Sequence, residues 1–254
     1  MSLLPEFSEH DLESEKEYWT KKLQVNCERC HGKGWYETEQ GIRKCGCVKR
    51  IFVYPEMIRS GFGKAYLEYD FNNIVKNNFT KKCKEYLMNF PKYFESGKGL
   101  FLFGEHGRGK TTIETIIVKE ILLRKNPDGT KNFSSAFFLY DDLVRKSLDK
   151  DIRYSELDNL FRKTDILVLD NIGSEIGLES KGKSSVLLLE KILRIRHMIM
   201  KPIILSANYD FQDIETKYSP VIASLIESQC ICVRSTGKDI RKQKANELNG
   251  GDID

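Results

Sequence analysis

The stretch Gly104-Glu105-His106-Gly107-Arg108-Gly109-Lys110-Thr111 decides the fold of this 254-residue chain. It fits G-x-x-x-x-G-K-[ST], a pattern in which a glycine-rich turn surrounds phosphate groups with backbone N–H groups. The apolar run 99–103 precedes it, and 112–124 follows with the spacing of a helix packed on a sheet. The sequence therefore predicts a phosphate-binding loop over Gly104 to Thr112, in which Lys110 reaches the phosphates of a nucleotide and the Thr111 hydroxyl holds Mg²⁺.

A second element of the same site ends a later apolar run. Ile166-Leu167-Val168-Leu169 is followed by Asp170, which comes 60 residues after Lys110. A carboxylate at the end of such a strand assists Mg²⁺ binding in P-loop enzymes. Taken alone, the glycine-rich motif would also fit a turn that binds no ligand. Asp170 alone would also fit a residue that caps a turn. Together they predict a P-loop NTPase.

Apolar runs alternate with stretches of helical spacing from about residue 81 onwards. This alternation predicts a doubly wound α/β domain, with ligands at the carboxyl ends of parallel strands. The expected strands are 99–103, 135–140, 166–169, 202–206 and 230–233, and the expected helices are 112–125, 141–163, 184–200 and 213–228.

The composition predicts a globular protein and argues against a membrane-spanning or secreted one. Hydrophobic residues make up 40% and charged residues 31% of the chain, as in an ordinary globular protein. No apolar stretch approaches the roughly 20 residues that cross a bilayer. Residues 1–17 are acidic and lack the order of a signal peptide, so a cytoplasmic location is expected. The net charge of +4 is mild, so any contact with nucleic acid must come from local patches.

Four of the seven cysteines, Cys27, Cys30, Cys45 and Cys47, fall within 21 residues. In a reducing compartment such a cluster indicates metal ligation before disulfides. Two chelating pairs of thiolates suit a closed, tetrahedral, structural Zn²⁺, and four protein ligands leave no open position for a catalytic water. The surrounding segment has almost no aliphatic core and needs such a staple. The alternatives are four reduced cysteines or, less favoured, an iron–sulfur cluster.

These features divide the chain into four parts. We expect an N-terminal helix plus a four-cysteine zinc module over 1–55, a linker over 56–80, an ATPase domain over 81–242 and a flexible tail over 243–254.

Several stretches in one order and spacing resemble the DnaC/DnaI-type helicase loaders and the related IstB transposition ATPases. The resemblance covers roughly residues 65–242 and is much more specific than the phosphate-binding loop alone. It implies an AAA+ fold, ATP with Mg²⁺, and delivery of a hexameric replicative helicase onto single-stranded DNA, with an N-terminal region that docks the helicase. The matching stretches are Tyr69 to Asn73, Gly97 to Thr112, Asp141 to Leu143, Asp165 to Gly173, Lys201 to Asn208 and Gly237 to Arg241.

The resemblance also assigns roles to residues around the phosphates. Asn208 occupies the position that senses the γ-phosphate, although it would also suit a helix cap. Asn171 stands where AAA+ ATPases usually carry an acid that orients the attacking water. An amide cannot accept a proton, so either hydrolysis is slow and ATP acts mainly as a switch, or Glu175 supplies the carboxylate. We favour slow hydrolysis, with Lys110, Asp170, Asn171 and Asn208 as the catalytic set.

One family feature is missing. Helicase loaders usually carry an arginine before the last strand that reaches the nucleotide of a neighbouring subunit, but the matching helix around 219–226 has none. Arg194, Arg196 and Arg234 are candidates to replace it. Self-association on ATP therefore remains an open expectation.

Two basic regions are candidates for contact with DNA. Arg145, Lys146, Lys150 and Arg153 follow the second expected strand of the ATPase domain, where loaders carry a helical element that faces single-stranded DNA. The second region surrounds the cysteines and would equally suit a protein-docking face, which the resemblance favours. Its residues are Arg29, Lys33, Arg43, Lys44, Lys49 and Arg50, with Trp35 and Tyr36.

The sequence thus favours a helicase loader with no membrane partner. The main rival is an IstB-like regulator that binds duplex DNA and a transposase. A free-standing nucleotide kinase would need a lid and acceptor-binding arginines, which the sequence does not offer.

Overall fold

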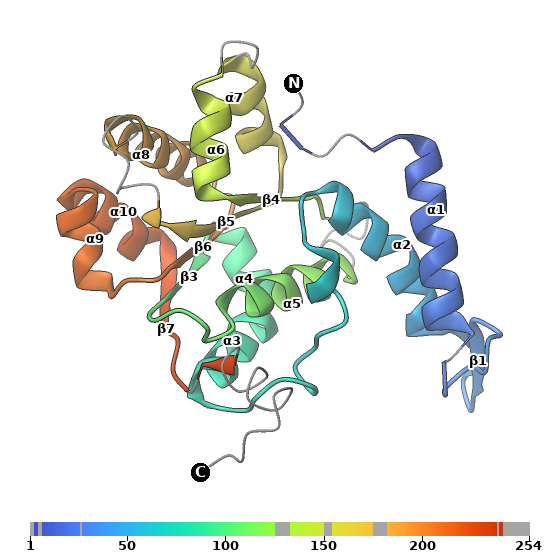
Figure 1. Cartoon of the computed structure of the whole chain (residues 1–254). Coiled ribbons are helices and arrows are strands. Elements are labelled where there is room, and N and C mark those ends of the chain that lie inside the picture. The colour runs from blue at the N-terminus through green and yellow to red at the C-terminus, as the bar shows by residue number, and fades with distance from the viewer. Residues whose placement is uncertain are drawn as a thin grey trace, which may run out of the picture.

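The computed structural model describes residues 3–4, 7–25, 27–124, 133–149, 154–174, 182–237 and 239–240. In this part of the chain a five-stranded, fully parallel sheet forms the centre of the molecule (Figure 1), in the order β4-β5-β6-β3-β7. The predicted α/β fold with a parallel sheet flanked by helices is confirmed. The strands are β3 (Gly99–Phe103), β4 (Ser135–Leu139), β5 (Ile166–Ile172), β6 (Ile203–Ala207) and β7 (Cys230–Arg234).

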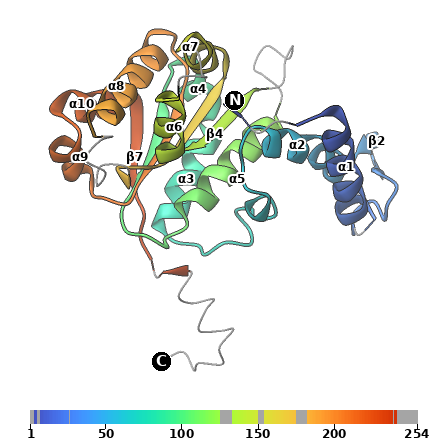
Figure 2. The ribbon, with the colours of Figure 1, turned by 45° about the horizontal axis from the view of Figure 1, so that its top comes forward.

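Helices cover both faces of this sheet, which is why its strands are almost continuously apolar. Side chains alternate between two cores: Phe101 points to one face, and Leu100 and Leu102 point to the other. Figure 2 shows α8 and α10 on one side of the sheet and α3 and α5 on the other. The helices of this domain are α3 (Asn78–Met88), α4 (Phe90–Glu95), α5 (Lys110–Leu122), α6 (Tyr140–Ser147), α7 (Tyr154–Lys163), α8 (Gly182–Met198), α9 (Phe211–Lys217) and α10 (Pro220–Gln229).

Two expected helices are each divided into a pair. Residues 141–163 form α6 and α7, and residues 213–228 form α9 and α10. The second division has a clear cause, because Pro220 occupies the first turn of α10 and Ser219 caps it by accepting a hydrogen bond from the Ile222 N–H at 3.2 Å.

The described residues of the N-terminal part form two α-helices, a short π-helical extension of the first (Thr20–Gln24) and a hairpin. Its elements are α1 (Glu9–Trp19), the hairpin of β1 (Trp35–Thr38) and β2 (Gly41–Lys44), and α2 (Gly46–Arg59). α1 lies alongside α2 in Figure 1, and Trp19, fully buried, packs edge-on against Tyr54 with 4.8 Å between the rings. No helix in the described part of the chain is both long and apolar enough to cross a membrane.

α2 runs from the cysteine cluster into the core of the larger domain. Its first turn contains Cys47, and its buried residues Ile51, Tyr54 and Met57 belong to the same core as α3 and α5. The boundary expected at residue 55 therefore falls inside this helix. A single element joins the cluster to the core beside the phosphate loop.

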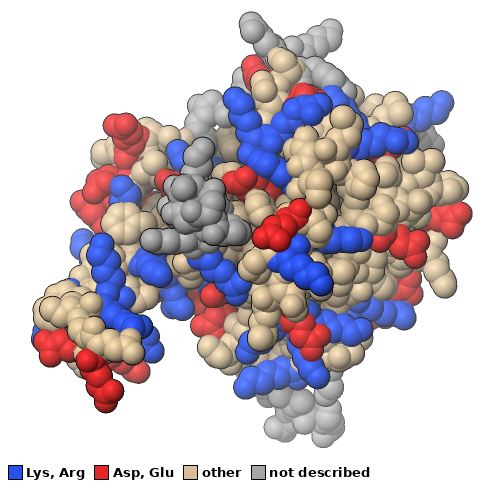
Figure 3. All heavy atoms as spheres, turned by 180° about the vertical axis from the view of Figure 1, so that it is seen from behind, with Lys and Arg blue, Asp and Glu red and all other residues tan. Residues whose placement is uncertain are grey.

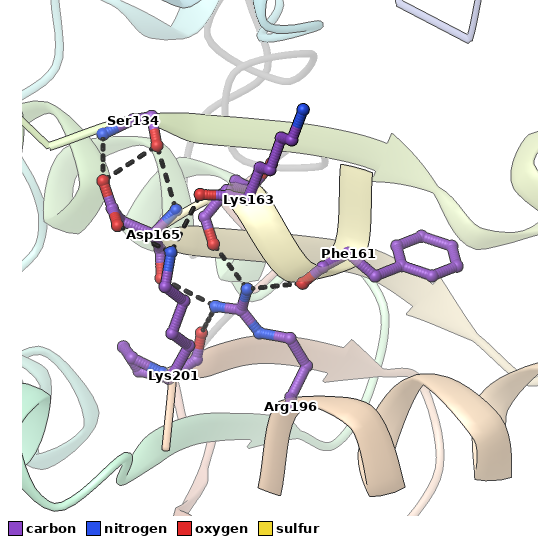
Figure 4. A network of polar contacts seen from close by, with 8 residues as sticks. Ser134, Phe161, Lys163, Asp165, Arg196 and Lys201 are labelled. Atoms are coloured by element: carbon purple, nitrogen blue, oxygen red, sulfur yellow. Dashed lines mark hydrogen bonds and ion pairs between the residues drawn. The ribbon is translucent and has the colours of Figure 1, made fainter. Parts of the chain in front are cut away.

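Arg196 joins the segments that lead into the amino ends of β5 and β6 (Figure 4). Its guanidinium is fully buried and donates to the backbone carbonyls of Phe161, Thr164, Asp165 and Pro202. Such a charge is held by carbonyl oxygens and is not free to reach another molecule. The expectation that Arg196 could act on a neighbouring subunit's nucleotide is therefore wrong.

Candidate nucleotide-binding site and metal centre

The phosphate-binding loop joins β3 to α5. Gly104, Gly107 and Gly109 have φ values of 117°, 75° and 82°, a region that glycine enters without strain. A Cβ on Gly107 would lie 2.1 Å from a carboxylate oxygen of Asp239, so no larger residue fits there as the loop stands. The buried Lys110 folds back and donates to the carbonyls of Gly104 and Glu105, both at 2.7 Å. The loop thus holds a lysine beside the amino end of α5, where helix N–H groups favour an anion.

Thr111, Asp170 and Ser206 meet beside this loop. The Thr111 hydroxyl donates to one carboxylate oxygen of Asp170 at 2.8 Å, and the Ser206 hydroxyl donates to the other. β6 lies between β3 and β5, which brings Ser206 next to Asp170. A hydroxyl and a carboxylate are ligands of the kind that Mg²⁺ takes beside phosphates. The sequence did not single out Ser206, and its only signal was a polar residue at the end of a buried strand.

Asn171 and Asn208 lie side by side at the same edge. The Asn208 side-chain amide donates to the side-chain oxygen of Asn171, whose backbone N–H donates to the Ser206 hydroxyl at 2.9 Å. Asn171 has φ 62°, a left-handed conformation in which asparagine is enriched. The register of β5 shifts between Leu169 and Ile172, and such irregularities turn side chains toward sites. Glu175 lies outside the described residues.

A cavity of about 830 Å³ opens from the loop and is large enough for a nucleotide. Its polar end contains the loop, Asp170 and the two asparagines. Apolar and aromatic side chains form a wall beside the loop, and Ile240 donates its N–H to the Gly107 carbonyl at 2.9 Å. One part of this wall comprises Tyr66, Tyr69, Ile74, Val75 and Ile240, and the cavity lining also contains Leu3, Leu4, Phe137, Phe138 and Leu139.

Glu114 is a buried acid that the sequence analysis did not identify. It lies one turn after Thr111 in α5, is fully buried, and its carboxyl group interacts with the side chains of Asp170 and Ser206. Burial, together with the charge of Asp170, raises the pKa of Glu114 well above its usual range. An acid within the apolar run 113–118 was the available signal.

The four clustered cysteines converge as a metal site requires. All four sulfur atoms lie within 4.8 Å of one another, with Cys27–Cys45 and Cys30–Cys47 separations of 3.6 Å. Thiolates on a tetrahedral Zn²⁺ at about 2.3 Å stand roughly 3.8 Å apart, so these residues fit the ion. Burial opposes ionisation of Cys27, but the N–H groups of Cys30 and Arg29 lower the pKa of its thiol to about 7.

Two of the four residues expected to contact DNA beside the second strand, Arg145 and Lys146, have partners within the protein. Arg145 forms ion pairs with Asp141 at 2.8 Å and with Asp142, and the Lys146 ammonium donates to the Leu3 carbonyl at 2.7 Å. Lys150 and Arg153 lie outside the described residues. In Figure 3 basic and acidic side chains are interspersed over the face shown. DNA binding by this region stays a prediction.

The two remaining arginine candidates are exposed. Arg194 pairs with Glu190 on α8, and Arg234, at the end of β7, pairs with Asp210, both at 2.8 Å. Arg234 also lies near the loop, since it is paired in register with Phe103, the residue that precedes Gly104.

Replacement of Glu114 by glutamine tests the buried acid. Because the folded-state pKa is raised, the unfolded chain releases this proton first, and wild-type stability falls as pH rises above about 4.5. Glu114→Gln removes that loss, so its stability gain should grow between pH 5 and pH 8, by up to ~1.4 kcal/mol per pH unit. Urea unfolding of nucleotide-free protein measures it, with Glu120→Gln on the same helix as the control. A gain that is equal at both pH values would contradict this assignment.

Metal analysis of the purified protein tests the cysteine cluster. We expect about one equivalent of Zn²⁺, lost in Cys30→Ser because three thiolates leave the tetrahedral site open. Cys232→Ser changes an exposed cysteine outside the cluster and should keep the metal. Less than about half an equivalent in the wild type would count against the site.

Comparisons with known proteins place the chain near replication factors. No protein-family model matches. The replicative helicase loader DnaI of Bacillus subtilis (strain 168) is 28% identical over 139 residues, which are 54% of this chain and 41% of that relative, less than half its length. A DnaC helicase loader structure has a TM-score of 0.56 at 22% identity, covering 68% of this chain and 100% of the other. The replication initiator DnaA bound to AMPPCP and single-stranded DNA has a TM-score of 0.54 at 20% identity, covering 74% and 57%.

The similarity to solved structures identifies the fold. The match to DnaI is a similarity in sequence. The larger part of the chain has the AAA+ fold, and its resemblance to the DnaC/DnaI-type helicase loaders is confirmed.

Proposed function

We propose that this protein is a cytoplasmic helicase loader: an ATPase that binds a hexameric replicative DNA helicase through its N-terminal zinc region and places it on single-stranded DNA. The observation that carries the proposal is the match to DnaI in a chain whose Lys110, Thr111 and Asp170 converge at one cavity. Neither feature alone gives a function, because AAA+ domains serve many roles.

The nucleotide is ATP with Mg²⁺. When the nucleotide is bound, the Lys110 ammonium would turn from the loop carbonyls to the phosphates, and the Thr111 hydroxyl and the Asp170 carboxylate would hold the metal. The DnaA structure with AMPPCP supports a nucleotide in this fold. The apolar wall of the cavity suits the base.

Hydrolysis is slow, and ATP acts mainly as a conformational switch. Asn171 pairs with Asn208 and offers an amide where a base would need a carboxylate. This pair can orient a water molecule and respond to the γ-phosphate without accepting a proton. The switch then depends on binding and release more than on turnover.

The hairpin of the zinc region is the proposed docking face for the helicase. Ile42 is 70% exposed and Trp35 is 38% exposed. Neither side chain belongs to the small core that surrounds the cysteines. Self-association on ATP would bring Arg194 or Arg234 to a neighbour's nucleotide, and single-stranded DNA would bind beside α6.

Asn171→Asp tests the slow-hydrolysis proposal. Aspartate has the same length and tolerates the left-handed backbone at this position, so it supplies a base without strain. We expect ATP hydrolysis to rise at least about tenfold, since a general base contributes about 10²–10⁴-fold. Phosphate release measures it, with Lys110→Ala as the background. An unchanged or lower rate would contradict the proposed cause of slow turnover.

Reconstitution with the cognate replicative helicase tests the loader function itself. The protein, the helicase and ATP should form a stable complex that loads onto single-stranded DNA coated with its binding protein. Lys110→Ala should lose the dependence on ATP, and Cys30→Ser should lose the complex. Absence of a complex, together with tight filaments on duplex DNA, would instead favour the IstB-like alternative, a regulator of a transposase.

A further inference from the structure

Lys119 is a buried cation that neither the phosphate site nor the metal site uses. It lies on α5, is 1% exposed, and donates to the backbone carbonyls of Leu67, at 2.9 Å, and Tyr69. Burial lowers the pKa of Lys119 to about 8. Taking an ammonium group out of water costs free energy, and the hydrogen bonds to these two carbonyls offset that cost.

The two carbonyls belong to the segment that builds the apolar wall of the cavity. Leu67 is fully buried, whereas Tyr66 and Tyr69 line the cavity, followed by Ile74 and Val75. Val75 is 55% exposed, an apolar side chain left open beside the nucleotide cavity. Beyond the wall, the Asn77 side chain donates to the Thr236 carbonyl at 3.0 Å and ties the segment to the strand end near the loop.

The same helix carries the phosphate-binding residues. Lys110 and Lys119 are nine residues apart on α5, a distance of about 13 Å along the helix axis. One rigid element therefore holds the phosphates at its amino end and the base-side wall near its carboxyl end. α2 also reaches this point, since the Tyr54 ring lies 5.8 Å from the Lys119 ammonium.

We propose that Lys119 is a positioning residue for the base of the bound nucleotide. By holding the carbonyls of Leu67 and Tyr69, it fixes the wall of Tyr69, Ile74 and Val75 at a set distance from the phosphate loop. Affinity for the base then depends on Lys119, and affinity for the phosphates does not. The inference rests on the proposed nucleotide binding.

Calorimetric titration with Mg²⁺-ATP and with Mg²⁺-tripolyphosphate, which has no base, tests this division. Lys119→Met should weaken ATP binding about tenfold or more, because hydrogen bonds from a charged donor contribute about that much. The affinity for tripolyphosphate should stay within about twofold of the wild-type value. Lys119→Gln, which keeps an N–H donor, replaces the methionine variant if that fails to fold. Arg196→Lys is the matched control, because it disturbs another buried cation on backbone carbonyls, at the opposite edge of the sheet, and should leave both affinities unchanged.

Val75→Ser provides a variant at the exposed surface, where folding is not at risk. Val75→Ser should weaken ATP binding by a smaller factor than Lys119→Met does. It should leave the affinity for tripolyphosphate unchanged. Equal weakening of ATP and tripolyphosphate in Lys119→Met, or no weakening of either, overturns the positioning role. A wild type that binds tripolyphosphate and ATP equally also overturns it. A wild type that binds neither overturns nucleotide binding itself.

Discussion

The packing of α5 against the sheet is the constraint on which the other features depend. Its amino end supplies Lys110 and Thr111, its middle places the buried Glu114 behind Asp170, and its later turns carry Lys119 to the wall of the cavity. The apolar residues between these positions are fully buried in one core. Because a packed helix moves as a unit, phosphate, metal and base contacts share one support.

α5 is also connected to the cysteine cluster, through its packing with α2. α2 begins beside Cys45 and ends in the core that α5 shares, and Tyr54 packs on Trp19 of α1 while lying near Lys119. A continuous helix thus joins the cysteine cluster to the core that contains α5. In the proposed loader, this helix would connect the nucleotide to the region that docks the helicase.

The sequence predicted the strands to within a few residues because they are apolar runs buried on both faces, a signal independent of distant contacts. It missed α2, since Pro55 lies within the helix and weakens a helical prediction. It predicted which residues would hold the phosphates and the metals, but not the hydrogen bonds between their side chains. The burial of Lys119 was inaccessible, because only the folded packing shows that this charged side chain is buried.

Hydrogen–deuterium exchange with Mg²⁺-ATP and with Mg²⁺-tripolyphosphate tests most directly whether α5 joins the phosphate site to the N-terminal region. Both ligands should protect the loop at 104–112. ATP alone should also protect the wall at 66–75 and the second half of α2, because only a base reaches the wall that Lys119 holds. Protection confined to the loop with both ligands would contradict the account.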